Sequence, residues 1–272
     1  MLDTPLRFDC AGDTLYGVAS VPATPATRGV VIVVGGPQYR AGSHRQFTLL
    51  ARALAAQGIA VLRFDVRGMG DSEGTPRAFE DTGADLRAAV TAFMEHVPSV
   101  RDVALWGLCD GASAAALYAS GDARVAGLAL LNPWVRTEAG AATATIKHYY
   151  RARLFDKAFW YKLASGKFNA GAAVRAAFGL AKTAMHAPAG ALPDQVLRGL
   201  AGFNGKVLVM LSGADLTAQE FAGVSVSTDE WRTLMAQQRV TRHDLAGADH
   251  TCSKRDWHDQ VAAWTADWLR AW

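Results

Sequence analysis

The segment that decides the fold is Asp102–Gly111, whose sequence is DVALWGLCDG. Its first half is apolar enough to form a buried strand, and the small residues of Ala112–Ser120 after it favour a helix. Between the two lies Gly107-Leu108-Cys109-Asp110-Gly111, which has the G-x-nucleophile-x-G spacing of a nucleophile elbow. The flanking glycines let such a sharp turn approach its neighbours closely. We therefore predict a strand, a sharp turn with Cys109 at its tip, and a helix.

The alternation of strand and helix extends outward from this segment in both directions. The predicted strands are Leu6–Cys10, Leu15–Val21, Gly29–Val34, Ile59–Phe64, Asp102–Trp106, Val125–Leu131, Lys206–Leu211 and Arg239–Leu245. The predicted helices run from an N-cap at Ser43 to Gly58, from about Phe79 to Glu95, over Ala112–Ser120, and through a last segment with Trp257, Val261, Trp264 and Trp268. This order predicts an α/β fold in which helices flank a mostly parallel central sheet.

The alternation stops near Pro133. Residues 134–200 are helical in pattern and contain no strand candidate, whereas strand patterns resume at Lys206. We predict a core made of residues 1–133 and 201–272, with a helical cap, residues 134–200, inserted between them. A chain of 272 residues that is 50% hydrophobic has enough apolar material for one such core.

Composition and charge narrow the class of protein. A formal net charge of +3 without a basic run argues against nucleic acid as a partner. The N-terminus lacks the pattern of a secretory signal, and no stretch of about 18 uncharged apolar residues is present to span a membrane. Three scattered cysteines match neither a disulfide framework nor a zinc site, and no motif implies a metal or another cofactor. These features predict a cytoplasmic protein and leave its oligomeric state open.

A thiol nucleophile needs a base, and the base needs an orienting acid. With this elbow, the chain order is nucleophile, acid, histidine. Asp215 follows the strand Lys206–Leu211, and His250 lies in the loop between the last strand and the last helix. We predict Cys109, His250 and Asp215 as the catalytic residues; Asp249 is a weaker candidate acid because its side chain should point away from its neighbour's. The alternative is that Cys109 is simply a small buried hydrophobe.

The oxyanion hole is expected to use the backbone N–H of Asp110 and a second donor from the loop after Gly29–Val34. That second position is occupied by Pro37, which has no N–H. Gln38, through its backbone or its side-chain amide, and Gly36 are therefore the candidate second donors.

With these residues in place, the whole chain resembles the α/β-hydrolase superfamily. Three segments are more narrowly similar to the type-1 hydrolase of the exosortase A system: GGPQYRAGSHRQF (Gly35–Phe47), RFDVRGMGDSEG (Arg63–Gly74) and GLCDGAS (Gly107–Ser113). That family occurs in Gram-negative bacteria, in gene clusters tied to exopolysaccharide and protein sorting. The resemblance implies neighbours such as acyl carrier proteins and acyl-activating ligases.

The predicted cap is basic and aromatic. Residues 136–200 contain ten Lys or Arg against three Asp or Glu, which suits an anionic acyl donor such as a carrier protein or a coenzyme A thioester. Tyr149 and Trp160 are candidates for lining an acyl pocket, and Arg40, near the oxyanion loop, is a candidate for binding substrate. The alternative is a solvated helical face with ordinary packing beneath it.

These residues predict acyl transfer from an ester or thioester through an acyl-Cys109 intermediate, resolved by water or by an alcohol. The expected substrate is a small-molecule or carrier-bound acyl compound, with an acyl carrier protein as a candidate partner. A different class of function is a carrier-protein-binding or scaffold protein that keeps the fold without turnover, which the replaced serine and Pro37 favour. A third is a lactone hydrolase of the dienelactone hydrolase kind, against which the long aromatic cap argues.

Overall fold

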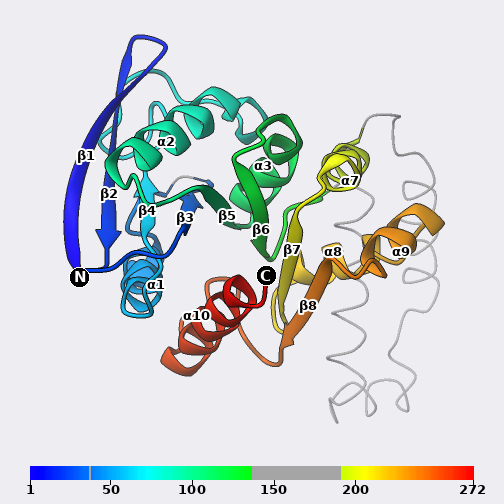
Figure 1. Cartoon of the computed structure of the whole chain (residues 1–272). Coiled ribbons are helices and arrows are strands. Elements are labelled where there is room, and N and C mark those ends of the chain that lie inside the picture. The colour runs from blue at the N-terminus through cyan, green and yellow to red at the C-terminus, as the bar shows by residue number, and fades with distance from the viewer. Residues whose placement is uncertain (37, 137–190) are drawn as a thin grey trace, which may run out of the picture.

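The computed structural model describes residues 1–36, 38–136 and 191–272. The strands in these ranges are β1 (Leu2–Cys10), β2 (Asp13–Val21), β3 (Arg28–Val33), β4 (Val61–Phe64), β5 (Asp102–Leu108), β6 (Val125–Leu131), β7 (Lys206–Ser212) and β8 (Val240–Leu245). They form one sheet in the order β1-β2-β4-β3-β5-β6-β7-β8 (Figure 1). Strand β2 is antiparallel to β1 and β4, and every other pairing is parallel. The predicted mostly parallel sheet is confirmed.

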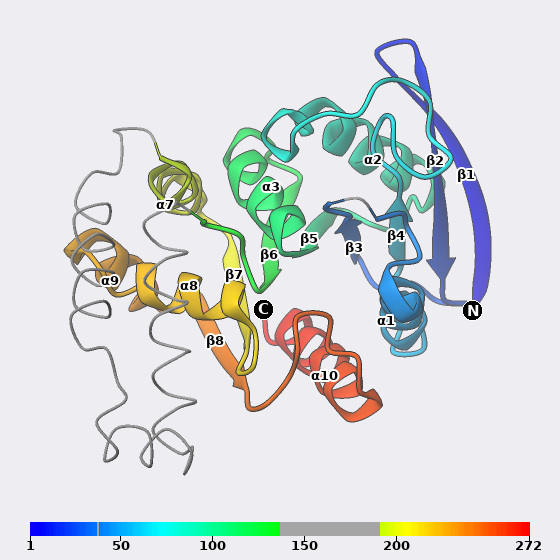
Figure 2. The same ribbon diagram turned by 180° about the vertical axis from the view of Figure 1, so that it is seen from behind.

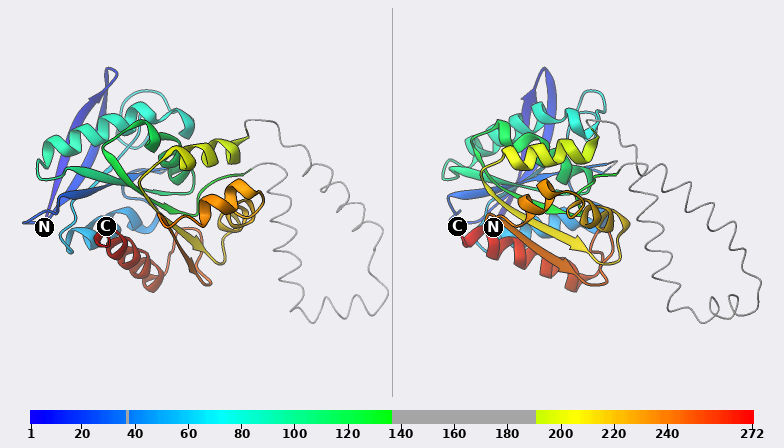
Figure 3. Two further views of the ribbon diagram at one scale, coloured as in Figure 1. Left: turned by 45° about the vertical axis from the view of Figure 1, so that its right-hand side comes forward. Right: turned by 90° about the vertical axis from the view of Figure 1, so that its right-hand side faces the viewer.

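Helices cover both faces of this sheet (Figures 1 and 2). The α-helices in the described ranges are α1 (Gln46–Ala55), α2 (Gly83–His96), α3 (Asp110–Tyr118), α7 (Leu192–Gly202), α8 (Leu216–Val224), α9 (Asp229–Met235) and α10 (Arg255–Arg270). The layers separate clearly in Figure 3, where α2, α3 and α7 lie on one side of the sheet and α1 and α10 on the other.

The alternation of side chains along β5 shows how the two faces are filled. Leu105 packs into the core beneath α2 and α3, whereas its neighbour Trp106 packs against Phe47 of α1 on the opposite face. Both are almost fully buried. Because burying a large apolar side chain contributes about 1.5–3 kcal/mol, residues of this kind stabilise both layers.

Strand register brings the ends of the parallel strands to one edge of the sheet. Gly107 of β5 pairs with Val33 of β3, Leu108 with Leu131 of β6, and Leu245 of β8 with Ser212 of β7. In open α/β sheets, ligands bind outside the carboxyl ends of the strands. The loops that follow β3, β5, β7 and β8 therefore meet at the edge where the predicted site residues lie.

The prediction that Ser43 caps the first helix is wrong. The α-helix begins at Gln46, after a short 3-10 turn, and no side chain caps either element. His44 and Arg45 have φ values of 53° and 60°, in the left-handed region, which separates the turn from the helix. The N–H groups of Phe47 and Thr48, in the first turn of α1, donate instead to the Ala41 carbonyl.

Helices α8 and α9, between β7 and β8, are a structural finding that the sequence pattern did not predict. The Asp215 carboxylate caps α8 by accepting from the N–H of Ala218 at 2.9 Å. Phe221 of α8 and Trp231 of α9 meet edge to face with ring centroids 5.7 Å apart, and both are buried. Both rings belong to the core that also contains Val209 and Leu211 of β7.

Helix α7 occupies the end of the segment predicted as a cap. Its residues Val196 and Leu200 are buried in the core, and Gly199 lies directly against the backbone of Ala116 in α3. The segment 137–190 lies outside the described residues, so the helical cap stays a prediction. None of the helices in the described ranges combines the length and apolar content needed to cross a bilayer.

Candidate active site

The elbow places Cys109 at the junction of β5 and α3. Its backbone has φ 60° and ψ −125°, a strained conformation outside the helix and strand regions. The Cys109 carbonyl accepts from the N–H groups of Ala112 and Ser113, which begins α3. A side chain at Gly111 would collide with the Val33 carbonyl, so glycine is required there. The turn thus presents the thiol at the N-terminus of α3.

His250 and Asp215 meet at the same edge. Nδ1 of His250 lies 3.0 Å from Oδ2 of Asp215, and the side chain of Cys109 is near enough to the imidazole to affect its pKa. Asp215 is held in turn because its Oδ2 caps α8. The structure therefore brings the three predicted catalytic residues together in the order thiol, imidazole, carboxylate.

The pKa of His250 is raised to about 10, chiefly by its hydrogen bond to Asp215 and next by the one to Cys109. Burial acts in the opposite direction and is outweighed. An imidazole with this pKa is a cation at neutral pH. The contact between His250 and Asp215 thus holds a protonated imidazole against a carboxylate.

The other two cysteines have different surroundings. Cys10 and Cys252 are each 4% exposed, and burial is the main reason that the pKa of each thiol is raised to about 11. Cys109 is only partly buried. All three are free thiols, and Cys109 is the one with an imidazole partner.

The Asp249 side chain forms hydrogen bonds within its own loop. Its carboxylate accepts from the N–H groups of Thr251 and Ser253 and from the Ser253 hydroxyl. These contacts turn it away from the imidazole beside it in sequence. Asp215, and not Asp249, is the carboxylate on His250.

The Asp110 side chain links the elbow to the oxyanion loop. One carboxylate oxygen accepts from the N–H of Gly36 at 2.7 Å and the other from the N–H of Gly111 at 3.0 Å. Burial raises the pKa of this carboxyl, an effect that these N–H donors partly oppose. The N–H of Gly36 is already donated to Asp110, and the second oxyanion donor stays a prediction. The side-chain Oε1 of Gln38 is buried without a hydrogen-bond partner in the described residues.

Arg40 has a structural task. Its guanidinium contacts the buried carboxylate of Asp65 and donates to Asp71 at 2.5 Å, and its backbone N–H donates to Asp65 at 2.6 Å. These bonds fasten the loop after β3 to the loop after β4. Its predicted contact with substrate stays a prediction, as do those of Tyr149 and Trp160, which lie outside the described residues together with Pro37.

Asn132, which sequence reasoning did not single out, lies at the centre of this edge. It follows β6 and is fully buried, and its amide bonds both Ser212 at the end of β7 and the backbone carbonyl of His250. The only sequence signal was the dipeptide Asn132-Pro133, which indicates a turn.

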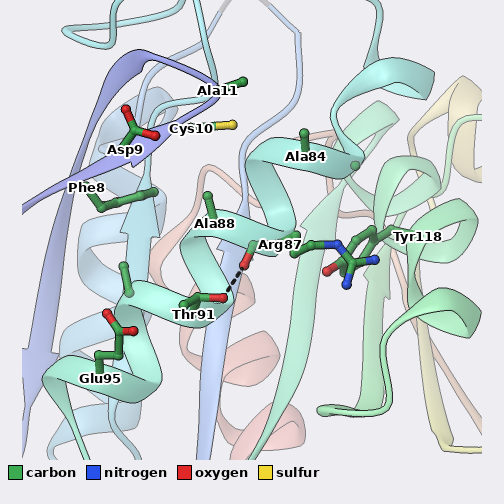
Figure 4. A pocket seen from close by; sticks show the side chains of 12 residues that line it. Phe8, Asp9, Cys10, Ala11, Ala84, Arg87, Ala88, Thr91, Glu95 and Tyr118 are labelled. Carbon is green, nitrogen blue, oxygen red and sulfur yellow. Dashed lines mark hydrogen bonds between the residues drawn. The ribbon is translucent and has the colours of Figure 1, made fainter.

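Hollows lined by described residues lie beside the fold. A groove of about 640 Å³ is formed by the end of β1 and one side of α2, where Cys10 and Phe8 face Ala84 and Ala88 (Figure 4). A cavity of about 330 Å³ lies between α1 and the segment Thr251–Ser253 that follows His250. None of the three predicted catalytic residues lines either hollow. Among the described residues, no group of His, Cys, Asp or Glu is arranged to hold a metal ion.

A strand-order reversal at β3, an elbow after β5, an acid after β7 and a histidine after β8 define an α/β-hydrolase. Comparison with protein families agrees: residues 25–177 match the model described as serine aminopeptidase, S33. The chain belongs to that family of α/β-hydrolases.

Among curated proteins, the polyketide transferase grgF of Penicillium sp. is 36% identical over 90 residues. That match covers 32% of this chain and only 31% of the relative, less than a third of each. It shows a local similarity.

Solved structures show the fold over the full chain. The Pyrococcus furiosus esterase Pf2001 superposes with a TM-score of 0.68 at 15% identity, covering 100% of this chain and 93% of that one. GrgF from Penicillium sp. sh18 gives 0.66 at 18% identity, with 100% and 99% covered. Est1E from Butyrivibrio proteoclasticus, solved with ferulic acid bound, gives 0.63 at 15% identity, with 97% and 99% covered.

Proposed function

We propose that the protein is a cysteine-dependent acyl hydrolase or acyltransferase that acts on an ester or thioester. Cys109 is the nucleophile, His250 the general base and acid, and Asp215 the carboxylate that orients the imidazole. The observation that carries this proposal is the contact of Nδ1 of His250 with Asp215 at 3.0 Å, at the edge of the sheet where the strained elbow presents Cys109.

In the first half of the reaction, the Cys109 thiolate attacks the acyl carbonyl. A tetrahedral intermediate forms and collapses to a thioester on Cys109, and the imidazolium of His250 gives its proton to the departing alcohol or thiol. In the second half, neutral His250 takes a proton from water or an alcohol, which attacks the thioester and releases the Cys109 sulfur. Each half moves one proton through His250, so the enzyme returns to its starting state.

Ester and thioester substrates suit this nucleophile better than amides. The tetrahedral intermediate of an amide expels its amine only after His250 has protonated the nitrogen, because the thiolate is otherwise the better leaving group, whereas an ester or thioester makes no such demand. The description of the matching family, serine aminopeptidase, names enzymes that cleave amide bonds with a serine. Because Cys109 takes the place of that serine at the elbow, we propose ester or thioester cleavage for this chain instead.

Transfer to an alcohol is as compatible with the site as hydrolysis. A thioester on Cys109 is more reactive towards an acceptor than an oxygen ester would be. The local relative is a polyketide transferase and two of the superposed structures are an esterase and a ferulic acid complex, so the relatives span both outcomes. Which one occurs depends on the acceptor that reaches Cys109.

The acyl donor is proposed to be anionic or carrier-bound. The support is the charge of residues 136–200, with ten Lys or Arg against three Asp or Glu. A role in exosortase-linked exopolysaccharide metabolism rests on the wording of the three quoted motifs alone. An acyl carrier protein is the partner that both considerations favour.

Turnover of a short-chain thioester tests the proposal. We expect the wild type to release free thiol, and Cys109→Ala to release none while unfolding at nearly the same temperature, because only one small atom is lost. A folded Cys109→Ala variant that keeps wild-type turnover would overturn the proposal. Adding alcohols then separates the outcomes: a new ester product identifies a transferase.

A catalytically weak carrier-binding protein is the second candidate. It is favoured by the oxyanion side of the site, where Pro37 has no N–H and that of Gly36 is already donated to Asp110. Such a protein would bind acyl carrier protein equally well with Cys109→Ala and would release no thiol from any thioester tested.

A further inference from the structure

A single buried amide joins the two segments that carry the predicted base and acid. Oδ1 of Asn132 accepts from the N–H of Ser212 at 2.8 Å, and Nδ2 donates both to Oγ of Ser212 and to the carbonyl of His250, each at 3.0 Å. One acceptor and both donors of the side chain are therefore in use, and all three bonds go to these two segments.

Each hydrogen bond of the Asn132 amide fixes a segment that carries either His250 or Asp215, the two members of the ion pair. Ser212 ends β7, and its carbonyl accepts the N–H of Asp215 at 3.3 Å, so fixing Ser212 fixes the start of the acid turn. The bond to the His250 carbonyl fixes the backbone from which the imidazole projects. Asn132 thus ties the two backbones together at the point where Nδ1 of His250 meets Asp215 at 3.0 Å.

The backbone of Asn132 is held in an unfavourable conformation. Its φ is 48°, in the left-handed region, and Pro133 follows it, which further restricts the residue before it. Asparagine is among the few non-glycine residues that adopt this conformation readily. Glycine would adopt it more easily but would lack the amide, so the amide is the feature that the position requires.

We propose that Asn132 is a positioning residue that sets the distance between His250 and Asp215 and thereby orients the imidazole towards Cys109. This inference rests on the proposed function. Asn132 does not touch the reacting atoms in the contacts described; it acts through the backbone of His250 and through Ser212.

The test measures the rate at which iodoacetamide alkylates Cys109 as a function of pH, followed by peptide mass spectrometry so that Cys10 and Cys252 are scored separately. Asn132→Asp keeps the shape and the acceptor but removes both donors. Asn132→Gly relieves the strained φ and removes the amide without adding charge. Ser20→Ala is the matched control, because Ser20 is a fully buried hydroxyl on β2 that bonds Asp3 at 2.6 Å.

We expect both Asn132 variants to alkylate about tenfold more slowly at pH 7, with profiles displaced to higher pH by about one unit, since one unit corresponds to a factor of ten. Ser20→Ala should keep the wild-type profile. A merely structural residue would lower the unfolding temperature and leave the profile of the folded protein unchanged, and that result would overturn the inference. If neither Asn132 variant folds, Ser212→Ala replaces them, because it removes one of the three hydrogen bonds of the Asn132 amide. Its alkylation profile should then also be displaced to higher pH.

His250→Ala separates failure of this inference from failure of the proposed function. If His250→Ala displaces the profile and the Asn132 variants do not, the triad stands and the positioning role fails. If His250→Ala has no effect either, the thiolate–imidazolium pair is absent and both proposals are overturned.

Discussion

At the scale of single residues, the three cysteines differ in what surrounds the sulfur. Cys109 contacts an imidazole, whereas the pKa of Cys10 and that of Cys252 are raised to about 11, mainly by burial. We expect native protein at pH 7 to be alkylated by iodoacetamide at Cys109 first, as read by peptide mass spectrometry. Equal labelling of all three in urea provides the control. Labelling of Cys10 or Cys252 ahead of Cys109 in the folded protein would contradict this assignment.

The pKa of His250 provides a second prediction at this scale. Its largest cause is the hydrogen bond to Asp215. Asp215→Asn removes the negative charge while keeping the size of the side chain, so the pKa of His250 should fall from about 10 towards the ordinary value of about 6.5. An NMR titration of the imidazole measures this directly, with His243, which stacks on Trp264, as an internal reference. An unchanged His250 titration in Asp215→Asn would assign the shift to another group.

At the scale of elements, Arg40 fixes the oxyanion loop to the loop after β4 through Asp65 and Asp71. In Arg40→Gln the oxyanion loop loses its ion pairs with Asp65 and Asp71, so the N–H donors that this loop supplies to the oxyanion are positioned less accurately. Since loss of one oxyanion donor lowers kcat by about 10²–10³, we expect a smaller fall of about tenfold in kcat from misplacement alone. Alkylation of Cys109 should remain at the wild-type rate, because the imidazole pair is untouched.

Arg52→Gln is the matched control for this loop. Arg52 also forms an ion pair, with Asp3 at 2.8 Å, but its side chain is 51% exposed, and exposed pairs contribute about 0–1 kcal/mol. Its kcat should equal that of the wild type. A rise in KM at unchanged kcat in Arg40→Gln would mean that Arg40 binds substrate, as the sequence predicted, and does not aim the loop.

The elements that the sequence pattern predicted are those whose signal is local. The buried strands around Cys109 are continuous apolar runs, and the hairpin of β1 and β2 turns at Gly12, with φ 89°. The cap on α1 was mispredicted because His44 and Arg45 adopt the left-handed conformation, which is uncommon for residues other than glycine and has no signal in the sequence pattern. Helices α8 and α9 lie where neither periodicity nor length set them apart, although Asp215 and Thr228 serve as their N-caps.

The candidate site divides in the same way. The chain order of Cys109, Asp215 and His250 was enough to name them, because strand order in this fold brings those loops to one edge. Asn132 and the partners of Arg40 could not be named, because their importance comes from bonds between segments 25 to 118 positions apart. Such bonds leave no periodic trace in a single sequence.

At the scale of the whole molecule, the raised pKa of His250 makes stability depend on pH. A group whose pKa is higher in the folded state, about 10, than in the unfolded chain, about 6.5, binds its proton more tightly when folded. Its contribution is therefore fully present below about pH 6.5 and is lost as pH rises towards 10.

Urea unfolding across this window checks that dependence. The difference in free energy of unfolding between wild type and Asp215→Asn should shrink from pH 6.5 to pH 10, leaving a constant part because Asp215 also caps α8. The corresponding difference for Ser20→Ala should stay level over the same range. If the difference in free energy of unfolding between wild type and Asp215→Asn grew with pH, it would have the opposite sign to that expected for an imidazolium stabilised in the folded state.

The measurement that tests the central claim most directly is intact-mass spectrometry of the protein mixed with a short-chain thioester and quenched in acid within seconds. Wild type should gain the mass of one acyl group, peptide mapping should place it on Cys109, and the adduct should decay with time. Cys109→Ala should gain nothing, and His250→Ala should accumulate little. An adduct of equal size on Cys109→Ala, or none on wild type while the thioester is consumed, would contradict a cysteine acyl-enzyme.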